Sequence, residues 1–88
     1  MNFLHSEFNL APDDVIEVTL DKQANVRLMD DTNFERYKRG EKHTYHGGLG
    51  TVSPVRLSPP HPGHWNVVID LGGYAGTVRS SARVLQHA

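Results

Sequence analysis

Apolar and polar residues alternate over short stretches along most of the chain, and clusters of turn-forming residues separate these stretches. A period of two points successive side chains to opposite faces of a β-strand, so the pattern predicts strands. The strands are expected at residues 3–10, 15–20, 24–29, 41–46, 52–57, 64–71 and 77–85. Short strands at regular intervals are typical of a sandwich or a barrel. The sequence therefore predicts an all-β fold with about seven strands and one short helix, a compact antiparallel β-sandwich or barrel that is jelly-roll-like.

Three features of these stretches indicate how the strands pair. Residues 15–20 and 24–29 are separated by only three residues, which favours an antiparallel hairpin. In the stretch 64–71, Val68 makes the second face partly apolar as well, which predicts a central strand. Pro54 cannot donate a ladder hydrogen bond, so its strand is expected at an edge or to start at the proline.

The one helix is expected shortly after residue 30. Several side-chain oxygens are available to cap a helix start, at Asp30, Asp31, Thr32 and Asn33. Among them, Thr32 has the spacing to Glu35 of a capping box, which satisfies free backbone N–H groups. Phe34 and Tyr37 are three residues apart, so they share one helix face. Gly40 suits the left-handed position that follows a helix end. The pattern predicts one short helix.

Composition narrows the class of protein. The chain has 88 residues, 38% hydrophobic and 22% charged, which fits one small β domain spanning residues 1–88. It has no cysteine, which excludes disulfides and thiolate metal sites. The first residues lack the basic and apolar regions of a signal peptide, and no stretch approaches the roughly 18 apolar residues of a membrane span. We therefore expect a cytoplasmic protein without membrane contact.

Charge is unevenly distributed, although the net charge is only −1. Residues 1–35 contain eight acidic and two basic side chains, whereas residues 36–88 contain two acidic and seven basic ones. The simpler interpretation is that the two parts form ion pairs within one fold. The alternative is a bipolar surface that associates head to tail into a homo-oligomer, whose apparent mass would fall as salt is raised.

Six histidines include two pairs with the same spacing, His43 with His46 and His61 with His64. Imidazoles are common ligands of zinc, nickel and iron, so these four residues are candidate metal ligands. Residues three apart on a strand point to opposite faces, however, so His43 and His46 converge only if the chain turns. The alternative is that all four are exposed side chains at strand ends and loops.

Two other clusters give weaker signals. The basic run 36–43 contains a tyrosine and resembles a phosphate-binding surface, but Glu41 interrupts it and no further aromatics supply a stacking platform, which argues against nucleic-acid binding. The glycine groups 47–50 and 72–76 precede predicted strands and not helices, so they predict hairpin turns and not phosphate loops.

Aromatic and histidine residues near strand ends form the candidate ligand-binding surface. These residues are Trp65, His64, His61, Tyr74 and Tyr45. Trp65 has an alternative role as the largest residue of the core, which we favour for that position. No nucleophile elbow occurs, and Asp70 before two glycines is expected to accept hydrogen bonds from turn amides. The sequence thus predicts no enzyme and no cofactor.

Five blocks of the sequence resemble a small bacterial family. They are residues 24–30, 33–34, 37–40, 53–57 and 61–73, which read ANVRLMD, NF, YKRG, SPVRL and HPGHWNVVIDLGG. The family is known only as domain of unknown function 1883. The resemblance implies a small β-rich fold and a place in signalling or defence, because similar domains precede TIR-type domains in larger bacterial proteins. It implies no catalytic residues, and we expect this chain to act without an attached effector.

Three functions remain open. The leading hypothesis is a recognition module that binds an unidentified ligand or protein partner. The second is a structural or self-assembly unit, and the third is a metal-binding protein or metal-dependent enzyme that uses the histidine pairs.

Overall fold

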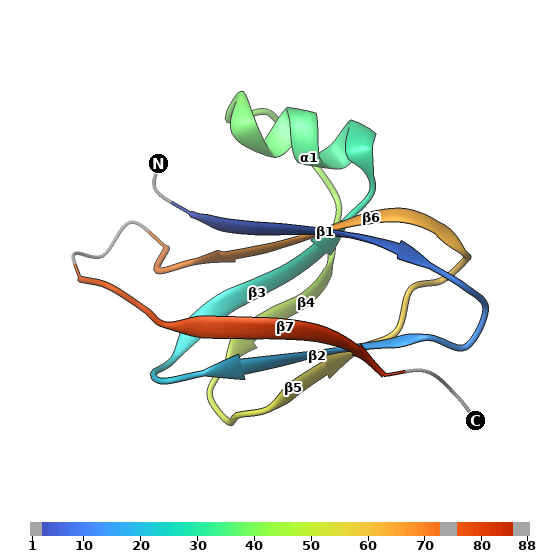
Figure 1. Ribbon diagram of the computed structural model, residues 1–88. Coiled ribbons are helices and arrows are strands. Elements are labelled where there is room, and N and C mark those ends of the chain that lie inside the picture. Colours follow the sequence, from blue (N-terminus) through green and yellow to red (C-terminus); the bar gives the residue numbers. More distant parts are fainter. Residues whose placement is uncertain (1–2, 73–75, 86–88) are drawn as a thin grey trace.

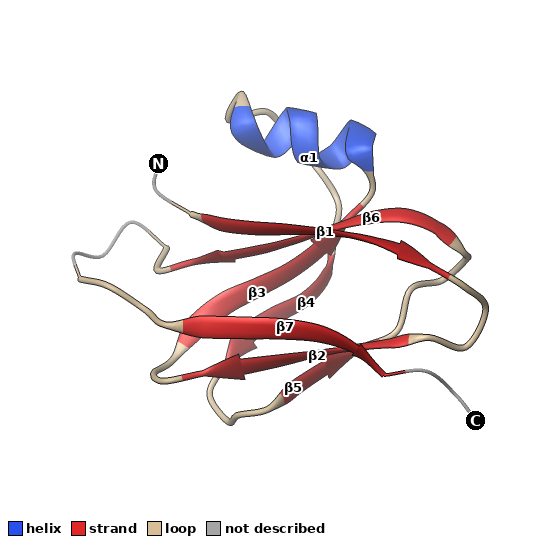
Figure 2. Cartoon of the chain, viewed as in Figure 1, coloured by secondary structure: helices blue, strands red, loops and turns tan. Residues whose placement is uncertain are grey.

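Two β-sheets packed face to face form the body of the protein, and one helix lies across the outer face of the first sheet (Figure 1, Figure 2). The computed structural model describes residues 3–72 and 76–85. Its elements are β1 Leu4–Leu10, β2 Val15–Leu20, β3 Ala24–Met29, α1 Asp31–Lys38, β4 His46–Gly50, β5 Val55–Leu57, β6 Gly63–Asp70 and β7 Ser80–Leu85. The predicted all-β sandwich with seven strands and one short helix is confirmed.

The order of the strands shows how the chain is wound. The first sheet has the order β1-β6-β3-β4 and the second the order β5-β2-β7. Three antiparallel pairings are nested, namely β3 with β4, β2 with β5 and β1 with β6. The chain from β1 to β6 is thus one long hairpin with α1 near its tip, rolled so that β2 and β5 fall in the second sheet. This winding is jelly-roll-like, as predicted, and β7 adds to the free side of β2.

The hairpin predicted for residues 15–20 and 24–29 is wrong, because β2 and β3 belong to different sheets. Ile16 and Val18 on β2 and Val26 on β3 are fully buried in one shared core. Two strands with one apolar face each can face one another across a core instead of pairing at their edges. Alternation along the sequence is the same in both arrangements, so it did not distinguish them.

The central position of β6 is confirmed, since β1 and β3 flank it. Trp65, Val67 and Ile69 point into the core between the sheets, whereas Val68 points to the outer face. There the helix covers a second, smaller core. This core contains Met29, Phe34, Tyr37 and Val68, with Phe3 packed against it. Phe34 and Tyr37 on one face of the helix therefore pack against the apolar outer face of β6 at Val68.

The helix starts at one of the caps that the sequence offers. The Asp30 carboxylate accepts hydrogen bonds from the backbone and side-chain N–H groups of Asn33, at 2.8 and 3.0 Å. Asp30 is thus the cap among the four candidates, and the capping box of Thr32 and Glu35 is wrong. Aspartate caps as well as threonine, which left the choice open. Gly40 has a φ of 72°, as expected after the helix end. Within the described ranges, no helix is long and apolar enough to cross a bilayer.

The strand predicted at residues 41–46 is wrong, because residues 41–45 form no strand and β4 starts at His46. The glycines predicted as a hairpin turn at 47–50 lie within this strand instead. A Cβ atom on Gly47 would lie 2.4 Å from the carbonyl oxygen of Val26, on the paired strand β3. Glycine therefore allows a close backbone approach here, a role that has the same sequence signature as a turn.

Strands β5 and β7 follow the prediction more closely. β5 begins directly after Pro54 and lies at the edge of the second sheet. β7 begins at Ser80, three residues later than predicted. The second glycine group, 72–76, falls partly on residues 73–75, which lie outside the described residues.

Candidate functional site

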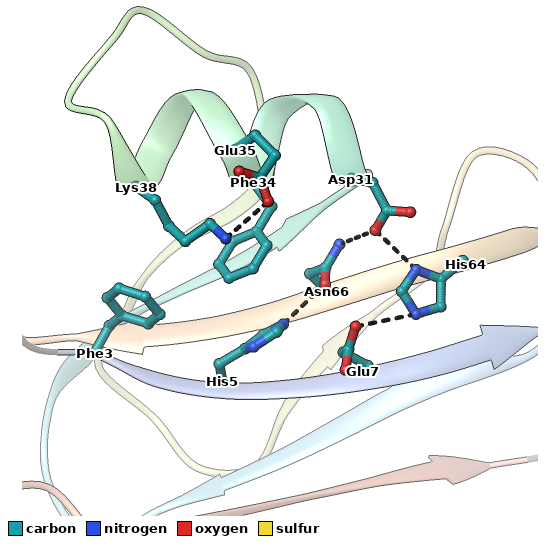
Figure 3. A pocket seen from close by; sticks show the side chains of 9 residues that line it. All are labelled: Phe3, His5, Glu7, Asp31, Phe34, Glu35, Lys38, His64 and Asn66. Atoms are coloured by element: carbon teal, nitrogen blue, oxygen red, sulfur yellow. Dashed lines mark hydrogen bonds and ion pairs between the residues drawn. The ribbon is translucent and has the colours of Figure 1, made fainter.

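A groove of about 580 Å³ lies between α1 and the outer face of the first sheet (Figure 3). One part of its lining is polar, with His5 and Glu7 from β1, Asp31 from α1, and His64 and Asn66 from β6. Figure 3 shows these side chains pointing toward one another across the groove. It brings titratable, aromatic and amide side chains together, and we take it as the candidate site.

Strand alternation positions the side chains of the groove. Trp65 and Val67 point into the core, so the intervening Asn66 must point outward. The antiparallel register then places Glu7 directly opposite Asn66 on the neighbouring strand. His5 lies two residues before Glu7 and therefore shares its face.

Asn66 is the centre of the polar network and is only 1% exposed. Its side-chain amide nitrogen donates to the backbone oxygen of Met29 at 3.2 Å and to the Asp31 carboxylate at 2.8 Å. Its carbonyl oxygen accepts from Nε2 of His5 at 2.8 Å. A buried amide with all these bonds holds β1, β3, β6 and α1 in a fixed relation.

His64 lies between two carboxylates. Its Nδ1 is 2.8 Å from Oδ1 of Asp31, and its Nε2 is 3.4 Å from Oε1 of Glu7. The hydrogen bonds from Asn66 and His64, helped by the nearby charge of the histidines, lower the pKa of the Asp31 carboxyl below its ordinary value. The Asp31 carboxylate is therefore an acceptor throughout the neutral range.

The other part of the groove is aromatic and cationic. The Phe34 ring lies 4.2 Å from the His5 ring and 5.9 Å from the Phe3 ring, measured between centroids. The Lys38 ammonium lies 4.6 Å from the centre of the Phe34 ring and 2.7 Å from the Glu35 carboxylate. An ammonium over an aromatic face beside a carboxylate is a cation–π site.

A second polar cluster surrounds Asp70, which is 2% exposed. Its carboxylate accepts hydrogen bonds from the Tyr37 hydroxyl at 2.6 Å, from the Asn25 amide at 2.9 Å and from the backbone N–H of Gly72 at 2.8 Å. It also forms an ion pair with Arg27. Burial raises the pKa of a carboxyl, but these four partners outweigh it and hold the pKa of Asp70 below its ordinary value. The bond to Gly72 confirms the predicted contact with a turn amide.

Tyr37 and Arg27 connect this cluster to the base of the helix. Burial and the adjacent Asp70 carboxylate raise the pKa of the Tyr37 hydroxyl well above its ordinary value. The Arg27 guanidinium lies 5.5 Å from the centre of the Tyr37 ring and 5.1 Å from that of the Tyr45 ring. Tyr45, predicted to bind a ligand, thus contacts Arg27 and is 42% exposed.

The other residues predicted for ligand binding are dispersed. Trp65 is 2% exposed and belongs to the core, so its ring is not on the surface, and its Nε1 donates to the backbone oxygen of His61 at 3.0 Å. The His61 ring packs 4.9 Å from the Trp65 ring. Tyr74 lies outside the described residues. Of the members of the predicted set that the structure describes, only His64 lies in the groove.

The two histidine pairs of the sequence are separated in space. The His43 ring packs against Tyr37 and Tyr45, whereas the His46 ring lies 5.9 Å from Trp65, near which His61 also lies. His64 contacts the carboxylates of the groove. Among residues 3–72 and 76–85, no group of three or more histidines and carboxylates is arranged to hold a metal ion.

Sequence reasoning missed His5, Glu7, Asp31 and Asn66 as site residues. Two signals were available. His5 and Glu7 fall on the polar face of the first predicted strand, and Asn66 is a polar residue in the middle of the most apolar one. An outward-facing polar residue on a central strand needs a partner above the sheet, which here is Asp31.

The outer face of the second sheet has a different character. Glu17 on β2 pairs with Arg56 on β5 at 3.2 Å and with Arg83 on β7 at 2.8 Å, directly opposite it in both registers. The hydrogen bond from Arg83, followed by that from Arg56, outweighs the effect of burial and lowers the pKa of the Glu17 carboxyl. An acidic residue of the first part of the chain is thus paired within the fold with two basic residues of the second.

Comparison with known proteins gives a family and no function. The family model described as Domain of unknown function (DUF1883) matches residues 1–88. No match is found among curated proteins or among solved structures.

Proposed function

The chain belongs to the DUF1883 family, a domain of unknown function, and we propose that it is a non-enzymatic recognition module whose binding site is the groove between α1 and strands β1 and β6. The observation that carries this proposal is the groove itself. Its volume of about 580 Å³ lies in the range of small-molecule sites, and it combines an aromatic wall with a fixed polar network.

The chemistry of the lining supports binding over catalysis. None of the residues that line the groove has a hydroxyl or thiol group. Asp31 orients His64 as a carboxylate orients a general base, but Nε2 of His64 faces the Glu7 carboxylate, which has no proton for a base to remove. A site of this kind can hold a ligand by hydrogen bonds and charge without attacking it.

The proposal extends to the setting of the protein. We propose that the module acts in the cytoplasm and in bacterial signalling or defence. The resemblance of the sequence supports the second of these, signalling or defence. The occupant of the groove is then a small ligand or a side chain of a protein partner.

A ligand panel with a groove-filling variant tests the proposal. Thermal unfolding of the untagged protein is measured with amines, simple sugars, nucleotides and divalent metals. A ligand at about 100 times its Kd stabilises the folded state by about 2.7 kcal/mol, which moves Tm by several degrees. In the variant Glu7→Tyr a bulky ring occupies the groove at an exposed strand position. The matched control is Thr19→Tyr, at an exposed strand position on the second sheet.

We expect a stabilising probe to act on the wild type and on Thr19→Tyr and to lose its effect on Glu7→Tyr. A probe that stabilises all three proteins equally would show that its site lies elsewhere. A panel without any stabilising probe would argue against small-ligand recognition.

Self-assembly remains the alternative function, with one observation behind it. The carboxylates of the groove lie on the outer face of the first sheet, and Arg56 and Arg83 lie on that of the second. Glu17 already neutralises part of this basic face, which reduces the charge available for a head-to-tail contact.

A further inference from the structure

The direction of each hydrogen bond in the groove follows from the groups involved. Asn66 uses its amide nitrogen to donate to Met29 and Asp31, so its carbonyl oxygen is the acceptor for His5. A carboxylate only accepts, so Nδ1 of His64 carries the hydrogen that Asp31 receives.

This assignment leaves two acceptors facing each other. A neutral imidazole has one N–H group, so when it is on Nδ1 the Nε2 atom of His64 presents a lone pair. That lone pair lies 3.4 Å from Oε1 of Glu7, which is also an acceptor. Two acceptors at this distance attract only through a donor between them, which is a second proton on His64, a water molecule or an N–H group of a ligand.

The aromatic part of the groove indicates which kind of ligand would supply the N–H donor. The Lys38 ammonium already rests on the Phe34 ring and contacts the Glu35 carboxylate. The lining as a whole has three carboxylates and one lysine, an excess of negative charge when the histidines are neutral. The excess of negative charge thus favours a cation, and the Phe34 ring favours a cation that has an apolar chain.

We propose that the groove binds an organic cation with a primary ammonium group, whose N–H bonds bridge Oε1 of Glu7 and Nε2 of His64 while its alkyl chain lies against Phe34. This inference rests on the proposed function and names the ligand class of the same site. The ammonium is that of a free alkylamine or of a lysine side chain on a partner.

A proton competes with this ligand. The charged groups that face His64 are Glu7 from β1 and Asp31 from α1, with His5 farther along β1. A second proton on the imidazole would occupy Nε2 and take the place of the ligand N–H group.

The test is an NMR titration of the full chain with pentylammonium, with pentanol as the neutral analogue. At about pH 7.5 we expect saturable amide shifts along the groove with the cation, weak binding in keeping with so small a ligand, and no saturable shifts with pentanol. Glu7→Gln is expected to weaken pentylammonium binding about tenfold, whereas Glu41→Gln, an exposed carboxylate outside the groove, leaves it unchanged.

A gain of affinity gives an independent check. Lys38→Gln removes the internal ammonium and should tighten pentylammonium binding, whereas Lys42→Gln makes the same change of net charge at an exposed position outside the groove and should not. An acetylated Gly-Lys-Gly amide identifies the source. Tighter binding than pentylammonium indicates a lysine side chain, and weaker binding indicates a free amine.

The proposal is overturned if the cation gives no saturable shift in the groove, if pentanol binds as well, or if Glu7→Gln binds pentylammonium like the wild type. If a sugar or nucleotide binds in the groove while both cations fail, the ligand class is wrong and the recognition function stands. If no probe binds there, both fail.

Discussion

Two hydrogen-bonded clusters share the outer face of the first sheet, and they differ in how far their acceptors are satisfied. In the first cluster, the Asp70 carboxylate is 2% exposed and has four donors around it. In the second, the Asp31 carboxylate is 66% exposed, and the groove beside it contains a pair of facing acceptors, Glu7 and His64.

This difference indicates that the first cluster stabilises the fold and that the second is available for binding. A buried carboxylate with all its bonds formed leaves nothing for a ligand to add, and removing it leaves buried donors without partners. The exposed acceptors at the rim of the other network, Glu7 and His64, cost little to alter and gain from a donor. We therefore expect substitutions around Asp70 to act on folding and substitutions around Glu7 to act on binding.

Asp70→Asn is expected to have the largest effect. It removes the charge opposite Arg27 and turns one acceptor into a donor that faces Tyr37 or Asn25. Breaking a buried ion pair in this way costs about 3 kcal/mol of unfolding free energy. Urea unfolding, followed by the fluorescence of Trp65, should show a lower midpoint with an unchanged slope. The matched control Asp13→Asn, at an exposed turn position where asparagine tolerates the φ of 69°, should change little.

Tyr37→Phe removes one donor from the same carboxylate and keeps the ring. The bond to a charged acceptor is worth about 2 kcal/mol, so the midpoint should fall by less than in Asp70→Asn. Because the pKa of Tyr37 is raised in the fold, the stability it contributes is complete below its ordinary pKa near 10 and is lost as pH rises beyond it. The stability difference between wild type and Tyr37→Phe should therefore shrink in urea titrations above about pH 10. A difference that stays constant or grows there would contradict this account.

The sequence predicted the parts of the fold that depend on local pattern. Alternation located most strands, and the apolar second face at Val68 correctly made β6 central, because that face needs a cover from another element. The helix that provides the cover was predicted with Phe34 and Tyr37 on one face. Each of these features depends on residues within a few positions of one another.

Features that depend on which distant strands meet were missed. Val18 and Val26 show the same pattern whether β2 and β3 pair or face each other, so the hairpin was predicted wrongly. The glycines of β4 have no side chain to reveal a strand, and their role depends on the carbonyl of Val26.

The candidate site was predicted only at His64. Its partners are 33 residues away at Asp31 and on the edge strand β1 at Glu7, and the register that joins them is not encoded locally. Trp65 was a candidate for ligand binding because it is a large aromatic residue, and the role in the core that we favoured for it is confirmed.

Asp31→Asn is expected to have the smallest effect on folding and gives the sharpest contrast with Asp70→Asn. The carboxylate is mostly exposed, so water screens its contacts and its loss should cost at most about 1 kcal/mol at neutral pH.

Because the pKa of Asp31 is lowered in the fold, the stability it contributes is present above its ordinary pKa near 3.8 and is lost as pH falls below that value. Asp31→Asn should therefore show a slightly shallower loss of unfolding free energy between about pH 5 and pH 2 than the wild type, while the contribution of Asp70 to the acid dependence is retained. Urea titrations across this pH range, with Asp13→Asn as the control, measure how steeply the unfolding free energy of each protein falls with pH. A cost at neutral pH as large as that of Asp70→Asn would show that the groove is part of the stabilising framework, and its exposed network would then no longer indicate a binding site.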